Sequence, residues 1–407
     1  SAPELKHDDY ANVDVKGKIV AIMAGAPEAW ETTTRAYYSS GYLKGKFAAE
    51  HGAIGMISLW TPDFDPHYPW AAFLRNSKFP AFNVIDKTGK PKDSYEQIRG
   101  SVAVPVAKSK QLLSSAGLDI DEVVKKATTG EYVSKALPVR AQIHLVTEHK
   151  DASSPNVVAM LPGSDPKLKD EYVLYSAHLD HIGISAPDNG DSINNGAYDN
   201  ASGTAAVIEI ARAFSQMPKA PRRSIIFLNV TGEEEGLLGA YYFSLNPTVP
   251  IKNIVANINL DEIAALYPLK DIVALGAEHS TMNDDVMAAS KQVGFEISPD
   301  PFPEETYFIR SDQFPFVRQG IPAVFIGPGM KSSDPKVDGH AIYMNWLQHI
   351  YHTPHDEITL PFDWPSNVRL AQLNFIIGNR IANATSRPAW KKNDIFQQKF
   401  GGQVQSD

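Results

Sequence analysis

Apolar runs alternate with amphipathic stretches from about residue 150 onward. They predict strands over 156–161, 171–178, 222–230 and 253–261 and helices over 200–216 and 236–244. The first helix is expected to bury the face formed by Val207, Ile208, Ala211 and Phe214. Because the strands are apolar almost throughout, both faces of their sheet should be covered. The pattern predicts an α/β fold, a mixed and mostly parallel central sheet with helices on both faces.

The preceding part of the chain has shorter elements and fewer candidates for chemistry. The predicted elements are strands ending at Ala24 and over 54–60 and 102–109, helices over 42–53 and 110–117, and an aromatic, proline-rich loop over 61–85. These are typical of one small α/β module. Since catalytic residue types do not gather in it, we expect it to support the structure or to shape access for a substrate.

Polar residues collect where the long apolar strands end. His178 and Asp180 follow the strand over 171–178, Glu233 and Glu234 follow the next strand, and Asp261 ends a third. In parallel sheets, ligands bind at the carboxyl ends of the strands. Carboxylates brought to one such edge repel one another unless a cation holds them, because burying unpaired charge costs several kcal/mol. These strand ends therefore predict a metal site.

Composition narrows the chemistry. The 407 residues carry a formal net charge of -9, which argues against nucleic acid or an anionic membrane as the main partner. The longest apolar runs are far shorter than the roughly 20 residues that span a bilayer. The sequence has no cysteine, so metal ligands must be histidine, aspartate or glutamate. This set fits zinc, with manganese and cobalt left open.

The number of candidate ligands favours two ions rather than one. A single catalytic zinc takes three protein ligands, whereas two zincs about 3.5 to 4 Å apart need about two terminal ligands each and a bridging carboxylate. The candidates are His178, Asp180, Asp199, Glu233, Glu234, Asp261, His352 and His355. This set suits the two-zinc arrangement.

Six motifs in order carry a family resemblance. They are SAHLDHIG, NGAYDNASGTAA, GEEEGLLGA, NLD, RSDQFPF and YHTPHDE. Over about residues 150 to 390 the chain resembles the di-zinc aminopeptidase family that includes secreted bacterial leucine aminopeptidases. VKGKIV and KFAAEHGAIGMI resemble the protease-associated domain often inserted in that family. The resemblance implies a protease-associated domain over 14–137, a peptidase domain over 138–407 and a lead-in segment over 1–13.

The resemblance also implies roles for individual residues. It places His178 and Asp261 on one zinc, Glu234 and His352 on the other, and Asp199 between both. Glu233 matches the general base, Tyr351 matches the phenol that steadies the oxyanion, and Asp180 resembles the carboxylate that orients His178. His181 and His355 are expected to be loop or supporting histidines. Glu235 is expected to face away from the site.

The substrate side is less determined. Arg310 is expected to position the peptide, although with Ser311 and Asp312 it could instead form a local turn network. Phe314, Phe316 or Tyr307 would line the side-chain pocket. Glu262 either meets the substrate ammonium or is a solvated edge residue. An aromatic lining would favour an apolar N-terminal side chain.

We interpret the chain as a metal-dependent aminopeptidase that acts on peptides with two Zn²⁺ ions. Two alternatives stay open. A glutamate-type carboxypeptidase on the same scaffold would need basic residues aimed at the substrate carboxylate. A receptor-like relative without catalysis would have lost ligands, and here all are present.

The start of the chain and its destination are matters of expectation. The family usually has helices before the inserted domain, so we expect a longer natural precursor with an export signal. The resemblance implies a secreted or periplasmic bacterial protein. The sequence leaves the oligomeric state open.

Overall fold

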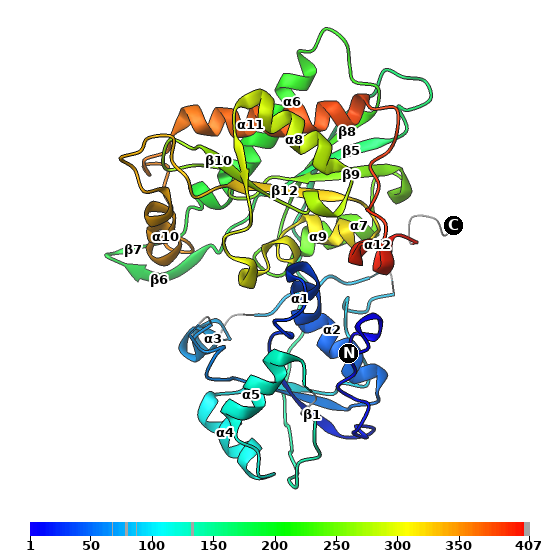
Figure 1. The fold of residues 1–407 in the computed structure, drawn as a ribbon, viewed down its shortest axis with the longest axis vertical. Helices are drawn as coiled ribbons and strands as arrows, with labels where there is room; N and C mark the ends of the chain where they lie inside the picture. Colours follow the sequence, from blue (N-terminus) through cyan, green and yellow to red (C-terminus); the bar gives the residue numbers. More distant parts are fainter. Residues whose placement is uncertain (67, 78–79, 87, 132–133, 403–407) are drawn as a thin grey trace. The chain divides into compact units, whose positions relative to one another are not determined.

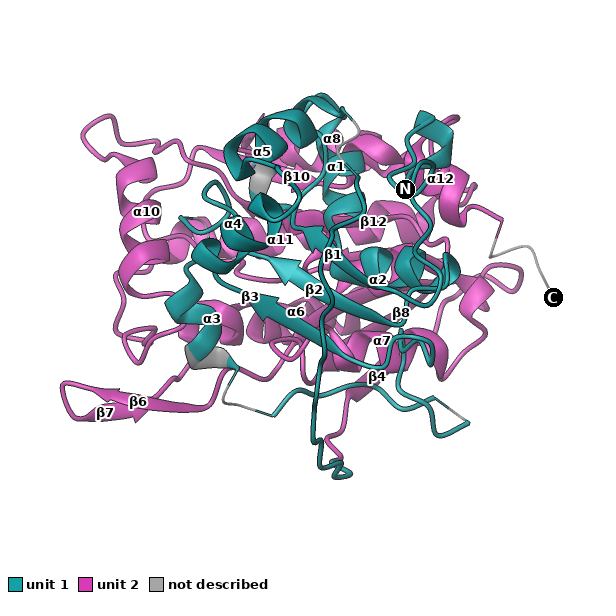
Figure 2. Cartoon of the chain, turned by 90° about the horizontal axis from the view of Figure 1, so that it is seen from below, with its two compact units in different colours: residues 1–152, 303–306 teal, residues 153–302, 307–407 magenta. Residues whose placement is uncertain are grey.

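The chain folds into two compact units. The computed structural model describes residues 1–66, 68–77, 80–86, 88–131 and 134–402. Unit 1 comprises residues 1–152 with 303–306, and unit 2 comprises residues 153–302 with 307–407 (Figure 2). Each unit has its own hydrophobic core.

Unit 1 is built around three parallel strands. Their order is β1 (Ile19–Met23), β2 (Gly55–Leu59) and β3 (Ser101–Val104). The helices are α1 (Thr32–Ser39), α2 (Gly41–Glu50), α3 (Trp70–Asn76), α4 (Val106–Ser114) and α5 (Ile120–Thr129), with short 3-10 turns η1 (Pro3–Leu5) and η5 (Pro303–Glu305). One core joins β1 and β2 to α2, and another joins the strands to α4 and α5. The small sheet therefore packs against α2 through one core and against α4 and α5 through the other.

The structure corrects two predictions in this unit. The stretch over 61–85 is not all loop, because it contains α3; residues 67, 78 and 79 of that stretch lie outside the described residues. The helix predicted from residue 110 begins at Val106, directly after Pro105. Proline has no backbone N–H to donate to a strand ladder, so the strand ends at Val104, before Pro105.

Unit 2 contains a seven-stranded mixed sheet, which confirms the predicted fold class. The strand order is β11 (Glu296–Ser298), β10 (Asp271–Leu275), β12 (Ala323–Pro328), β9 (Ile254–Asn259), β5 (Tyr172–His178), β8 (Ser224–Val230) and β4 (Val157–Leu161). Neighbours pair in parallel except β10 with β12 and β4 with β8. A separate hairpin joins β6 (Ile184–Asp188) to β7 (Asp191–Ile193).

Helices cover both faces of this sheet (Figure 1). The helices are α6 (Ser202–Ser215), α7 (Leu238–Leu245), α8 (Met282–Val293), α9 (Gln313–Val317), α10 (Gly339–His349), α11 (Trp364–Asn383) and α12 (Ile395–Phe400), with short turns η2 (Ala197–Ala201), η3 (Ile251–Asn253), η4 (Ala277–His279) and η6 (Tyr307–Ile309). Side chains of β5 alternate between two cores: Val173 and Tyr175 pack with α6, α8 and α11, whereas Leu174 packs with α7 and α9. Alternation of this kind is what a sheet buried on both faces requires.

One predicted core position of α6 is wrong. Ile208 is 57% exposed, whereas Val207, Ile210 and Phe214 are buried. Adjacent helical positions lie about 100° apart, so residue 208 turns away from the face that 207, 210 and 214 share.

Among the described residues, none of the helices combines the length and the apolarity needed to cross a bilayer.

Candidate active site

Two strand ends and the η2 turn bring the first ligand group together. His178 ends β5, Asp261 lies two residues beyond β9, and Asp199 lies in η2, just before α6. His178 Nε2 is 3.0 Å from Asp261 Oδ1 and 3.3 Å from Asp199 Oδ1. All three side chains are buried. Because β5 and β9 run parallel, their carboxyl ends lie at the same edge of the sheet, and this brings His178 close to Asp261.

The second group shares Asp199 with the first. His352 Nε2 is 3.2 Å from Asp199 Oδ2 and 3.2 Å from Glu234 Oε2. His181 Nδ1 is 2.9 Å from Glu234 Oε1. The carboxylate of Asp199 thus turns Oδ1 to one group and Oδ2 to the other, the arrangement of a bridging ligand.

The two groups together contain three carboxylates and three histidines. The Nε2 atom of His181 is buried without a hydrogen-bond partner among the described residues. Burial lowers the pKa of His352, but hydrogen bonds to Asp199 and Glu234 outweigh burial and raise that pKa to about 10. The carboxylates of Asp199 and Glu234 therefore bind a proton or a cation strongly. Clustered imidazole and carboxylate donors, with atoms within 4.8 Å of one another in each group, fit zinc.

Hydrogen bonds fix the ligands of the first group. Ser311 Oγ donates to Asp261 Oδ2 at 2.5 Å and accepts from the Asn259 side-chain amide at 2.8 Å. His178 Nδ1 is 3.1 Å from the backbone carbonyl of Asp180 and 3.9 Å from its carboxylate. The carbonyl of Asp180 therefore orients the imidazole, and its carboxylate instead accepts from the Glu233 N–H at 3.2 Å.

Two supporting residues were not predicted from the sequence. Asp356 is fully buried, and its oxygens accept from the backbone N–H groups of Tyr198 at 2.8 Å and Asp199 at 3.0 Å. The Asn200 side chain donates to the Leu260 carbonyl at 3.0 Å and accepts from the Glu262 N–H at 3.2 Å. Asp356 and Asn200 hold the Asp199 loop in register with the Asp261 loop. Their place inside the motifs of Asp199 and His352 was the available signal.

Glu233 and Tyr351 lie beside the ligand groups. Burial raises the pKa of Glu233 well above its usual value. Tyr351 stacks on His352 with ring centroids 3.8 Å apart. Both residues line a cavity of about 100 Å³. The neighbouring Glu235 is exposed, as predicted.

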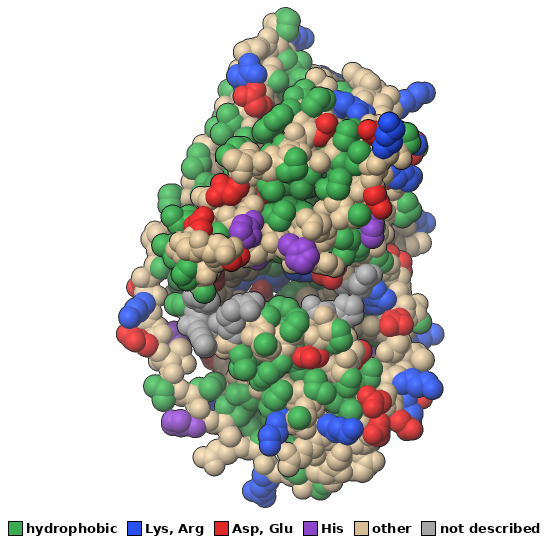
Figure 3. All heavy atoms as spheres, turned by 90° about the vertical axis from the view of Figure 1, so that its left-hand side faces the viewer, with side chains coloured by type: hydrophobic (Ala, Val, Ile, Leu, Met, Phe, Trp, Pro, Cys, Tyr) green, Lys and Arg blue, Asp and Glu red, His purple; other side chains and the backbone are tan. Residues whose placement is uncertain are grey.

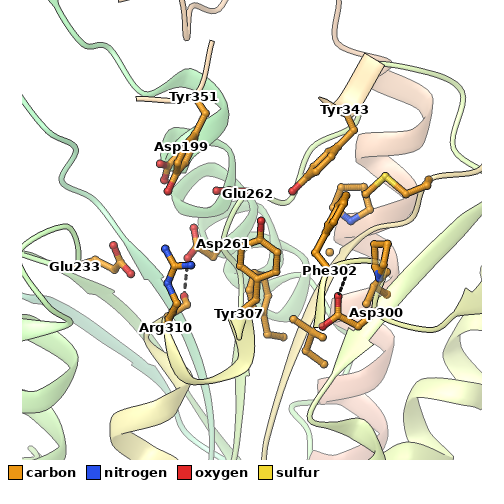
Figure 4. Close-up of a pocket in the computed structure, with 18 of the residues that line it drawn as sticks. Asp199, Glu233, Asp261, Glu262, Asp300, Phe302, Tyr307, Arg310, Tyr343 and Tyr351 are labelled. Atoms are coloured by element: carbon orange, nitrogen blue, oxygen red, sulfur yellow. Dashed lines mark hydrogen bonds between the residues drawn. The ribbon is translucent and has the colours of Figure 1, made fainter. Parts of the chain in front are cut away.

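The cavity lies within unit 2 and is partly apolar. Its apolar lining includes Val273, Leu275, Phe302, Phe325 and Met330. Figure 4 shows Glu262 between Tyr351 and Tyr343, with Arg310 beside Tyr307. Burial raises the pKa of Glu262 well above its usual value.

Two other predicted residues lie elsewhere. Phe314 is buried in α9 and is not among the described residues that line the cavity. His355 is half exposed and pairs with Asp188 of β6 at 2.8 Å. In the part of Figure 3 that unit 2 occupies, histidine side chains lie close to acidic ones at the surface.

Comparison with known proteins identifies a family. The sequence profile of Peptidase family M28 matches residues 156–376, more than half of the chain. A probable zinc metalloprotease from Pyrenophora teres f. teres is 39% identical over 108 residues, which are 26% of this chain and 22% of that protein. Aminopeptidase YwaD from Bacillus subtilis is 24% identical over 291 residues, 70% of this chain and 56% of that protein. The chain thus matches less than two thirds of either relative.

A solved structure resembles the chain over most of its length. An aminopeptidase from Aneurinibacillus sp. strain AM-1 is 20% identical with a TM-score of 0.45, and the alignment covers 93% of this chain and 71% of that one.

Proposed function

The chain belongs to Peptidase family M28, and we propose that it is a two-zinc aminopeptidase that releases apolar N-terminal residues from peptides. The observation that carries the proposal is the pair of ligand groups that share Asp199, with Glu233 at the wall of the adjoining cavity. His178 and Asp261 would hold one ion, and Glu234 and His352 the other. Bound zinc supplies Lewis-acid polarisation of a carbonyl and lowers the pKa of water.

Glu233 is the proposed general base. Burial raises its pKa, and a carboxylate with a raised pKa accepts and returns a proton more readily. A carboxylate oxygen of Glu233 accepts a proton from the attacking water as its oxygen bonds to the peptide carbon. Glu233 then passes that proton to the leaving nitrogen as the carbon–nitrogen bond breaks.

Tyr351 and Glu262 would orient the substrate. The Tyr351 hydroxyl donates a hydrogen bond to the carbonyl oxygen as negative charge develops there. Glu262 is proposed to pair with the substrate ammonium, since its carboxylate faces the cavity (Figure 4). Arg310 would contact the peptide backbone. A role for Phe314 in substrate binding stays a prediction without support from the cavity, because Phe314 is buried and is not among the described lining residues.

The charges of the cavity favour an ammonium over a carboxylate. Besides the proposed zinc ligands Asp199 and Asp261, its lining includes the carboxylates of Glu233, Glu262 and Asp300. Among the described lining residues, Arg310 is the only lysine or arginine. A carboxypeptidase would need more positive charge there, so an aminopeptidase fits better.

We also propose that residues 14–137 form a protease-associated domain and residues 138–407 the peptidase domain, with 1–13 leading in. The support is the small parallel sheet of unit 1, flanked by helices. Secretion is expected from the resemblance alone.

The test compares leucine anilide with N-acetyl-leucine anilide. We expect the zinc-loaded protein to hydrolyse only the free amine, because Glu262 and its neighbours recognise an ammonium. Equal rates on both substrates would contradict the aminopeptidase assignment. Hydrolysis of neither, together with release of a C-terminal glutamate from a peptide, would favour the carboxypeptidase.

A further inference from the structure

His181 lies in the second ligand group, although neither the sequence motifs nor the proposed mechanism gives it a role there. Its side chain is 7% exposed, and Nδ1 lies 2.9 Å from Glu234 Oε1 and 3.7 Å from Asp199 Oδ2. The His352 ring meets it edge to face, with centroids 5.4 Å apart. His181 thus faces the same two carboxylates as His352.

The backbone at Gly196 makes room for this imidazole. A Cβ atom at Gly196 would lie 2.7 Å from His181 Cγ, closer than real contacts allow, and 3.0 Å from His181 Cβ. Gly196 also has a φ of +63°, which glycine adopts without strain. The loop before Asp199 is therefore packed directly on the His181 ring and holds it in place.

The donor separations match a four-ligand site. Zinc bonds to nitrogen and oxygen ligands of about 2.0 to 2.1 Å imply that tetrahedral ligands lie about 3.3 Å apart. Histidine to carboxylate separations in the second group are 2.9, 3.7, 3.2 and 3.2 Å. The first group offers three protein donors, from His178, Asp199 and Asp261.

The two groups also differ in their relation to the cavity. His178 and Asp261 of the first group line it, together with the shared Asp199. The described lining residues include neither His181, Glu234 nor His352. The group with three donors thus faces the proposed substrate, and the group with four is set back from it.

We propose that His181 Nδ1 is a fourth protein ligand of the second zinc. The two positions are then unequal: the second is closed by four protein ligands, as in structural zinc sites, and the first keeps an open position, as in catalytic ones. Zinc fills the closed position first and leaves it last. The inference rests on the proposed two-zinc centre and adds an order of binding to it.

The other reading gives His181 a smaller role. His181 Nδ1–H could donate only a hydrogen bond to Glu234 Oε1 and so orient that carboxylate. The variant His181→Asn separates the two, because an asparagine amide can replace the Nδ1–H donor but is a poor zinc ligand. His355→Ala is the matched control, since His355 is a half-exposed histidine that pairs with Asp188.

The experiment titrates the metal-free full chain with zinc against a chromophoric chelator and measures X-ray absorption at one zinc per chain. We expect two binding steps in the wild type, the first with two imidazole ligands. His181→Asn and His181→Ala should weaken the first step by more than about 100-fold, the upper range for losing a mere supporting contact. Both should also remove one imidazole from the one-zinc spectrum, while His355→Ala behaves as wild type.

Several results would overturn the inference. Wild-type affinity and an unchanged nitrogen count in His181→Asn would leave His181 as a hydrogen-bond donor only. Two equal steps in an active wild type would overturn the order of binding and leave the proposed function intact. No zinc binding by the wild type would overturn both proposals. Circular dichroism identifies any variant that fails to fold.

Discussion

Stability should depend on pH through a buried ion pair remote from the ligand groups. His279 of η4 is 5% exposed, and its Nδ1 lies 2.6 Å from Asp394 Oδ2, just before α12. Burial lowers the pKa of His279, but the hydrogen bonds to Asp394 and Glu278 outweigh burial and raise that pKa to about 9. Protonated His279 therefore holds the C-terminal segment against η4.

The magnitude follows from that pKa. An unfolded histidine titrates near 6.5, and each pKa unit is worth about 1.4 kcal/mol, so the pair stabilises the fold by about 3 kcal/mol. Because the folded pKa is the higher one, this stabilisation is complete below about pH 6.5 and disappears as the pH rises through about 9. The variant His279→Gln removes the titrating group.

The assay is urea unfolding of wild type and His279→Gln from pH 6 to 9.5, followed by circular dichroism. The stability difference should shrink by about 3 kcal/mol across this range, because other titrating groups are common to both proteins. Asp394→Asn serves as a second variant; because Glu278 still pairs with His279, its stability difference from wild type should shrink with pH in the same direction but by less. A difference that stays constant, or that grows with pH, would refute the ion pair.

Other changes test the site itself. Glu233→Gln should lower kcat by about 10² to 10⁴-fold with unchanged zinc content, and a parallel loss of zinc would contradict its assignment as general base. Tyr351→Phe should lower kcat by about 10²-fold with little change in KM, and a change in KM alone would argue for substrate binding instead. Asp356→Ala leaves the N–H groups of Tyr198 and Asp199 without acceptors, which should lower the free energy of unfolding by about 1 to 3 kcal/mol. Tm should therefore fall and zinc affinity should weaken. Unchanged values for both would show that the contact is dispensable. Removal of metal by a chelator should lower Tm and zinc should restore it, because an ion that binds only the folded state stabilises it.

The four strands and two helices predicted in unit 2 agree with the observed ones to within about two residues, because long apolar runs are a local signal; the strands β10, β11 and β12 were not predicted. The strand over 171–178 corresponds to β5, Tyr172–His178, and the helix over 200–216 to α6. The burial of Ile208 was predicted wrongly, since neighbouring helical positions differ by about 100° and only the sheet decides which one faces it.

The candidate site shows the same division between local and distant contacts. Residue types at strand ends pointed to His178 and Asp261, and the structure places them 3.0 Å apart. The supporting role of Asp356 could not be predicted, because its hydrogen bonds reach the backbone of Tyr198 and Asp199. These residues precede it by 158 and 157 positions. The position of the His181 ring likewise depends on its packing against Gly196. The sequence pattern does not encode this contact.

The central claim is that Asp199 links two zinc ions. Elemental analysis of the purified wild type and of Asp199→Ala tests it most directly, with His355→Ala as a control outside the ligand groups. We expect about two zinc ions per chain in the wild type and in the control, and loss of most zinc in Asp199→Ala. One ion per chain in the wild type, or full zinc content without Asp199, would show that Asp199 does not link two zinc ions.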